Sequence, residues 1–179
     1  IFLLRKWEID WFYQEGASRI FPEAWDKYVE IIPEAERGDL LKAYHRRLTS
    51  PDRKVQLEAA KAWSIWEGST SCLAQDPDLM KKMGGDDFAT AYARNESHYF
   101  VNDGLFDRET LLLDEAHKIA HLPVVIVQGR YDIVCPAESA WNLKRVLPNA
   151  ELVIVPDAGH AAMEPGTLDA LVRATDRFA

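Results

Sequence analysis

The spacing of apolar residues divides the chain into a long helical region and a shorter α/β region. From residue 22 to about residue 121, apolar side chains recur every three or four positions. No alternation of apolar and polar residues, which would indicate a half-buried strand, interrupts this region. Proline, acidic residues and glycine mark the helix boundaries. We expect helices over residues 22–32, 33–48, 55–66, 88–100 and 109–120.

The pattern changes near residue 123. Two short runs, Val124–Val127 and Glu151–Val155, consist mostly of β-branched and other apolar residues. They are too short for helices and are typical of strands that are buried on both faces. Amphipathic segments over residues 137–147 and 166–178 follow them. The order strand, helix, strand, helix predicts a parallel sheet and the α/β fold class.

Two strands are too few for such a sheet, so we expect its other strands to lie upstream of Ile1. The chain has no initiator Met and opens inside an apolar segment, whereas natural termini are usually polar. We therefore expect the later part of a longer protein, in three divisions. Residues 1–9 would be the end of a core strand and a link, residues 10–121 a helical domain, and residues 122–179 the C-terminal part of the α/β core.

Composition and charge narrow the class of protein. The 179 residues include 29 Asp and Glu against 21 Lys and Arg, a net charge of −8, which argues against nucleic acid and anionic membranes as partners. No apolar run approaches the ~18 residues of a transmembrane helix, and the first residues do not match a signal peptide. The two cysteines lie far apart without metal-ligand neighbours. We therefore expect neither a disulfide framework nor a metal site. Reduced cysteines also predict a cytoplasmic location.

A polar residue with catalytic potential follows each predicted strand. Asp132 comes just after the first strand and His160 just after the second. The carboxyl ends of parallel strands are where α/β proteins build sites, and this order is the end of the Ser…Asp…His order of α/β-hydrolases. Asp132 would orient His160, which would take a proton from a serine and return it to the leaving group. Either residue alone would be an ordinary cap or loop residue, but the ordered pair favours catalysis.

The nucleophilic serine of such a triad is absent from this chain. The strand–turn–helix string Gly-x-Ser-x-Gly occurs nowhere in the sequence. The nearest string, residues 67–71, follows a predicted helix rather than a strand and lacks the second glycine.

Five longer motifs extend over most of the chain: residues 11–25, 55–68, 93–100, 129–132 and 158–160. Together they resemble the proline iminopeptidases, which are serine peptidases of the α/β-hydrolase fold. The resemblance implies a helical cap inserted before the last two strands of the sheet, a peptide substrate with an N-terminal proline, an acyl-enzyme intermediate and no cofactor. It also implies that the oxyanion loop and the serine turn belong to a first half of the protein, without which this chain would be inactive.

A free N-terminal proline presents a cationic amine on an apolar ring, and carboxylates among aromatic residues suit it. Glu67 ends an apolar helix one turn after Trp63, and Glu96 interrupts an aromatic stripe that includes Tyr99 and Phe100. From the residues alone, each glutamate could equally lie at a solvated helix edge or pair with an arginine. The resemblance implies that Glu67 and Glu96 are the amine-binding pair. We expect Tyr99 and Phe100 to contribute to the same substrate site.

Three functions remain open from the sequence. The first is an exopeptidase that releases N-terminal proline. The second is another α/β-hydrolase, an esterase or amidase whose cap only shields an apolar pocket. Two carboxylates in the cap favour the first, because a neutral substrate has no use for them. The third is a non-catalytic fragment or subunit that needs a separate first half, which the absent serine turn favours for the chain in isolation.

Overall fold

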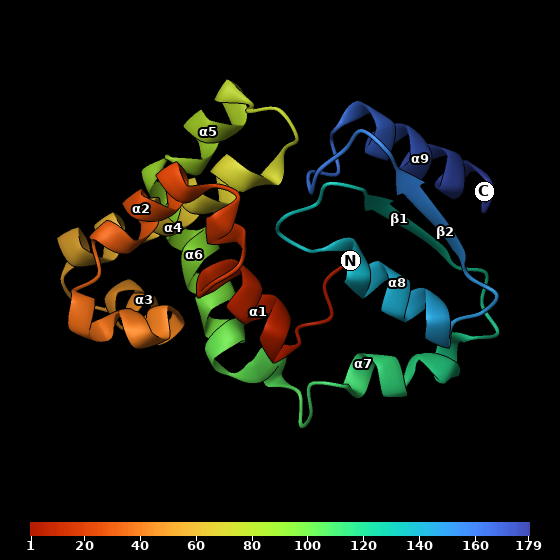
Figure 1. Cartoon of the computed structure of the whole chain (residues 1–179), viewed down its shortest axis with the longest axis horizontal. Helices are drawn as coiled ribbons and strands as arrows, with labels where there is room; N and C mark the ends of the chain where they lie inside the picture. Colours follow the sequence, from red (N-terminus) through yellow and green to blue (C-terminus); the bar gives the residue numbers. More distant parts are fainter.

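The computed structural model describes residues 1–179 and places a helical region beside a smaller α/β unit (Figure 1). The helical region runs from α1 to α6, and the α/β unit consists of β1, α8, β2 and α9. In chain order, with η for a 3₁₀ helix, the helical region contains α1 (Lys6–Tyr13), η1 (Ala17–Arg19), α2 (Pro22–Glu30), η2 (Glu34–Asp39), α3 (Leu40–Leu48), α4 (Arg53–Ser71), α5 (Pro77–Met83) and α6 (Asp86–Val101). The remaining elements are η3 (Asp103–Leu105), α7 (Leu111–Asp114), η4 (Ala116–Ile119), β1 (Val125–Gly129), α8 (Ala137–Val146), β2 (Glu151–Val155) and α9 (Pro165–Asp176).

The two strands are parallel and form one sheet. They are in register from Val125 opposite Glu151 to Gly129 opposite Val155. The helices α8 and α9 lie on opposite sides of the strands, and both contact them (Figure 1). The expected order strand, helix, strand, helix is therefore confirmed. Because both strands run in the same direction, the loops that follow them leave the sheet at the same edge.

The helical region packs around α4. This helix begins after Asp52, whose side chain accepts the backbone N–H of Lys54 at 2.8 Å. Trp63 and Trp66 on α4 are almost completely buried. The Trp63 ring stacks on Tyr13 of α1, with ring centroids 4.3 Å apart. Because rings of this size bury the most apolar area, these contacts hold α1 against α4.

Two segments expected as single helices are interrupted. Residues 33–48 form η2 and then α3, because Asp39 caps a new helix by accepting the N–H of Lys42 at 3.0 Å. Residues 109–120 form the short helices α7 and η4. A 3₁₀ turn keeps side chains three residues apart on one face, so apolar spacing alone did not reveal either break.

Two helices were missed. The short helix α5 begins after Asp76, whose side chain accepts the N–H groups of Asp78 and Leu79. Helix α1 occupies part of the expected link, and residues 1–4 pair with no strand.

None of the helices combines the length and the apolar character that a membrane crossing requires.

We expect the isolated chain to self-associate. Each strand pairs only with the other, so each has a free edge that can accept another strand. Large apolar side chains on the same unit are open to water: Trp141 of α8 is 58% exposed and Val172 of α9 is 48% exposed. Light scattering should therefore show a mass above that of one chain that rises with concentration. A monomer at every concentration would contradict this expectation.

Candidate active site

The structure brings Asp132 and His160 together at the sheet edge. Nδ1 of His160 lies 3.1 Å from both carboxylate oxygens of Asp132. The approach of the two loops requires glycine at the end of β1, because a Cβ on Gly129 would lie 1.9 Å from the carbonyl oxygen of Gly159. The N–H of Tyr131 also donates to the carbonyl of Ala158 at 3.0 Å. Backbone contact between the loops therefore sets the distance between the two side chains.

The Asp132 carboxylate is held on both oxygens. Oδ1 accepts the backbone N–H of Cys135 at 2.7 Å, and Oδ2 accepts Nε2 of Gln128 at 3.0 Å. Asp132 is 7% exposed, whereas the His160 side chain is 38% exposed. The carboxylate is thus fixed, and the imidazole keeps one side open to a further partner. Sequence reasoning missed Gln128, because a glutamine inside a strand carries no signal of the carboxylate it will meet.

His160 also borders a small cavity that contains both predicted glutamates. The cavity has a volume of about 120 Å³. It is enclosed mostly by aromatic and acidic side chains: Phe2, Glu8, Phe12, Tyr13, Glu67, Tyr92, Glu96, Phe100, Val134, Cys135 and His160. The helices α1, α4 and α6 and the two loops after the strands all contribute to it. The predicted amine-binding residues and the predicted catalytic histidine therefore share one space.

Neither glutamate lies at a solvated helix edge. Glu67 is 2% exposed and accepts the hydroxyl of Tyr13. Burial, and next the charge of Glu96, raise the pKa of Glu67 well above its ordinary value. Glu96 accepts Nε1 of Trp63 at 2.8 Å, and burial raises the pKa of this carboxyl as well. No Lys or Arg pairs with Glu67 or Glu96, whereas Glu8, the third carboxylate that lines the cavity, pairs with Arg5.

The structure separates the two aromatic residues expected beside Glu96. Phe100 is 8% exposed and lines the cavity, but Tyr99 is 49% exposed and contacts the ring of His98 instead. The tyrosines that line the cavity are Tyr13 and Tyr92. Tyr99 lies at the last turn of α6, where its side of the helix faces water. Helical spacing identified the stripe but not the part of it that other elements cover.

A buried ion pair at the start of α1, which Ser139 of α8 connects to the α/β unit, was also missed. Glu8 accepts the N–H groups of Leu3 and Arg5, at 3.2 and 2.9 Å, and Nε of Arg5 at 3.1 Å. The hydroxyl of Ser139 on α8 donates to Glu8 and accepts Nη2 of Arg5. The carboxylate of Glu8, the guanidinium of Arg5 and the hydroxyl of Ser139 therefore all have hydrogen-bond partners. The network joins the helical region to the α/β unit without leaving an unpaired charge. The available signal was a pair of opposite charges three residues apart, Arg5 and Glu8, directly after four apolar residues.

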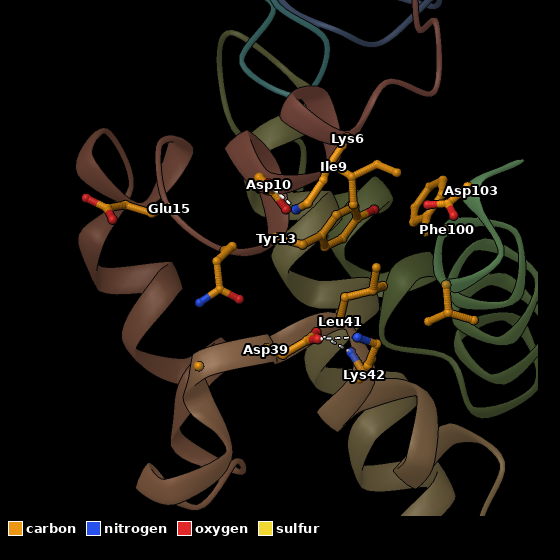
Figure 2. Close-up of a pocket in the computed structure, with 13 residues that line it drawn as sticks. Lys6, Ile9, Asp10, Tyr13, Glu15, Asp39, Leu41, Lys42, Phe100 and Asp103 are labelled. Atoms are coloured by element: carbon orange, nitrogen blue, oxygen red, sulfur yellow. Dashed lines mark hydrogen bonds and ion pairs between the residues drawn. The ribbon is translucent and has the colours of Figure 1, made fainter. Parts of the chain in front are cut away.

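A larger cleft lies on the other side of α1 (Figure 2). It has a volume of about 560 Å³ and shares Tyr13 and Phe100 with the small cavity. Charged pairs flank it, Lys6 with Asp10 and Asp39 with Lys42. The cleft contains none of the four residues Glu67, Glu96, Asp132 and His160, so we assign the candidate site to the small cavity. No group of three or more His, Cys, Asp or Glu side chains is placed to hold a metal ion.

We expect Glu67→Gln to stabilise the chain at pH 8 and to leave it unchanged at pH 4. Because the pKa of Glu67 is raised above 4.5, the native state keeps a proton that the unfolded chain has released, once the pH exceeds that ordinary value. The stabilisation from this group is therefore complete below the ordinary pKa and is lost as the pH rises toward the raised one. Glutamine has no such titration and still accepts the Tyr13 hydroxyl.

Thermal unfolding at the two pH values measures this effect. At pH 8 the midpoint of Glu67→Gln should be higher than that of the parent. The increase should be about 2–4 °C for each kcal/mol of desolvation cost and charge repulsion that the substitution removes. The control is Glu58→Gln, on the exposed side of the same helix, which should not change the midpoint. A lower midpoint for Glu67→Gln at pH 8 would show that the charge stabilises the fold.

Comparison with known proteins agrees with this architecture. Residues 13–167 match the family model described as alpha/beta hydrolase fold. The chain is 59% identical to the probable proline iminopeptidase of Leptolyngbya boryana over 178 residues. These aligned residues make up 99% of this chain and 56% of that relative. It is 57% identical over 178 residues to the proline iminopeptidase of Xylella fastidiosa strain 9a5c, 99% of this chain and 57% of that relative. With that of Arabidopsis thaliana it shares 51% identity over 179 residues, 99% of this chain and 47% of that relative.

The chain spans about half the length of these curated relatives. The family match, in contrast, covers most of the chain and includes Glu67, Glu96, Asp132 and His160. By this match the chain belongs to the α/β-hydrolase fold family.

Proposed function

We propose that this chain forms the substrate-amine site and the acid–base pair of a serine exopeptidase that releases N-terminal proline from peptides. The observation that carries the proposal is the pair of carboxyl groups, buried Glu67 and half-buried Glu96, in the cavity that His160 borders. Burying two acids without a cation is costly, and a ligand that supplies the cation offsets that cost. The high identity to proteins named proline iminopeptidases supports the same substrate.

The size and lining of the cavity suit a single small cationic ring. In the proposed complex the prolyl ammonium lies between Glu67 and Glu96 and gives each a charge-assisted hydrogen bond. The ring carbons contact the aromatic wall, of which Phe12 and Phe100 are buried parts. Because the two glutamates and His160 line the same small cavity, only the first residue of a peptide fits between the amine site and the base. Cleavage after that residue makes the enzyme an aminopeptidase.

The chemistry follows from the Asp132–His160 pair. Nε2 of His160 takes the proton of a serine hydroxyl as the serine oxygen attacks the prolyl carbonyl carbon. The tetrahedral intermediate collapses when His160 returns that proton to the nitrogen of the leaving peptide, which breaks the C–N bond and leaves a prolyl ester. Water then attacks the ester with His160 again as the base, and free proline and the serine hydroxyl are restored. Asp132 keeps Nδ1 protonated and stabilises the imidazolium in both steps.

The nucleophile and the oxyanion-binding groups belong, in this proposal, to polypeptide outside the 179 residues. The sequence contains no Gly-x-Ser-x-Gly turn, and the matched relatives are almost twice as long. The helical region α1 to α6 then acts as a cap over the sheet edge, and residues 122–179 act as the end of the core. The protein to be assayed is therefore the full-length protein that contains this chain.

We expect Glu67→Gln and Glu96→Gln each to lower kcat/KM for a prolyl substrate by about ten- to a hundredfold in that protein. Each change keeps the shape of the side chain and removes one charge-assisted hydrogen bond worth about 1.5–3 kcal/mol. The double variant should lose less than the sum of the two, because both carboxylates bind one cation. Hydrolysis of a small neutral ester should be almost unaffected. Equal losses on both substrates would assign the glutamates to holding the cap together and would favour a generic esterase.

We expect His160→Ala and Asp132→Ala to lower turnover of every substrate by about 10⁴-fold or more. The reason is that both variants lose proton transfer and not amine binding, so the loss should be the same for prolyl peptides and neutral esters. Circular dichroism and thermal unfolding serve as the control for folding. Turnover near the parent level in His160→Ala would exclude the proposed base.

A further inference from the structure

The loop that carries His160 is attached to the helical region mainly through its backbone. Three consecutive N–H groups of the loop point outward: Gly159 donates to Oε2 of Glu164 at 2.7 Å, while His160 and Ala161 both donate to the carbonyl of Ser71, at 2.9 and 2.8 Å. Ser71 is the last residue of α4. Since the His160 side chain is more than a third exposed, packing around the ring does not set its position.

Glu164 completes this attachment with its second oxygen. Oε1 accepts the N–H of Leu73, just beyond the end of α4, at 2.8 Å. One carboxylate therefore bridges the histidine loop and the helical region, and it binds one backbone N–H from each. The contact leaves no room for adjustment, because a Cβ on Gly159 would lie 3.0 Å from the nitrogen of Leu73.

The same end of α4 carries the amine site. Glu67 lies one turn before Ser71, and its carbonyl accepts the hydroxyls of Thr70 and Ser71 at 3.1 and 2.7 Å. The distance from the amine-binding carboxylate to the catalytic histidine is thus set by one helical turn, the Ser71 carbonyl and the Glu164 bridge. An aminopeptidase that cuts after one residue requires that distance to be constant.

We propose that Glu164 is a positioning residue that fixes His160 to the end of α4 and so maintains the one-residue spacing between the amine site and the base. This role rests on the proposed function of the cavity. Glu164 touches neither substrate nor reacting atoms, so its loss should misplace the imidazole and leave amine binding intact. A displacement of about 1 Å at a catalytic group can reduce rate by about a hundredfold.

The test is the full-length protein with Glu164→Gln and Glu164→Ala. Glu164→Gln leaves one acceptor oxygen for two N–H groups, and Glu164→Ala leaves none. We expect kcat for a prolyl substrate to fall by about tenfold and about a hundredfold, respectively, with KM within about twofold of the parent. The matched control is Asp157→Asn, which removes the same charge from the exposed part of the same loop and should keep parent kcat. A rise in KM at unchanged kcat, or parent kcat in both Glu164 variants, would overturn the proposal.

A second measurement does not rely on turnover. Hydrogen exchange of the Gly159 and Leu73 amides should become faster in both Glu164 variants, and the Nδ1–H proton resonance of His160 should broaden in NMR spectra. If the parent does not cleave prolyl substrates, the proposed function fails, and these two readouts still decide whether Glu164 holds the loop. Parent-like exchange at both amides would show that it does not.

Discussion

Two carboxyl groups confined in one aromatic cavity impose the strongest constraint on this molecule. Glu67 and Glu96 reach the cavity from α4 and α6, and their protein donors are the hydroxyl of Tyr13 and the indole of Trp63. Each donor binds one carboxyl oxygen and supplies no positive charge. Burial, and next the charge of Glu96, therefore raise the pKa of Glu67. The fold thus maintains a site that a cation would stabilise.

Close backbone approaches carry this constraint to Asp132 and His160. Gly129 and Gly159 allow the loops after β1 and β2 to touch, which places Asp132 against His160. The carbonyl of Ser71 then binds the histidine loop to α4, the helix that carries Glu67. Contacts of this kind involve no flexible side chain, so the geometry they define varies little. The helical region and the α/β unit therefore line one cavity, although each has its own apolar core.

Much of the site could be predicted because its members follow from local patterns. The apolar runs that become β1 and β2 are strong and short, and parallel strands place the residues after them, Asp132 and His160, at one edge. Glu67 was expected to end an apolar helix, whereas α4 continues to Ser71, one turn beyond it. Helical spacing was a weaker guide on α6, where it grouped Tyr99 with Phe100. One of them is covered by α1 and α4 and the other faces water, which spacing along a single helix does not encode.

Local sequence was sufficient for the fold class, the two strands and the candidate pair Asp132 and His160, because strand length, helix period and residue chemistry are properties of short segments. For Glu67 and Glu96 it left a solvated or paired carboxylate equally open, and only the family resemblance favoured an amine site. The hydrogen-bond partners were not accessible in this way. Gln128 finds Asp132, Arg5 and Glu8 find Ser139, and Glu164 accepts the N–H of a residue 91 positions away. These pairings exist only where separate elements approach one another, and that approach results from the packing of the whole chain rather than from any local pattern.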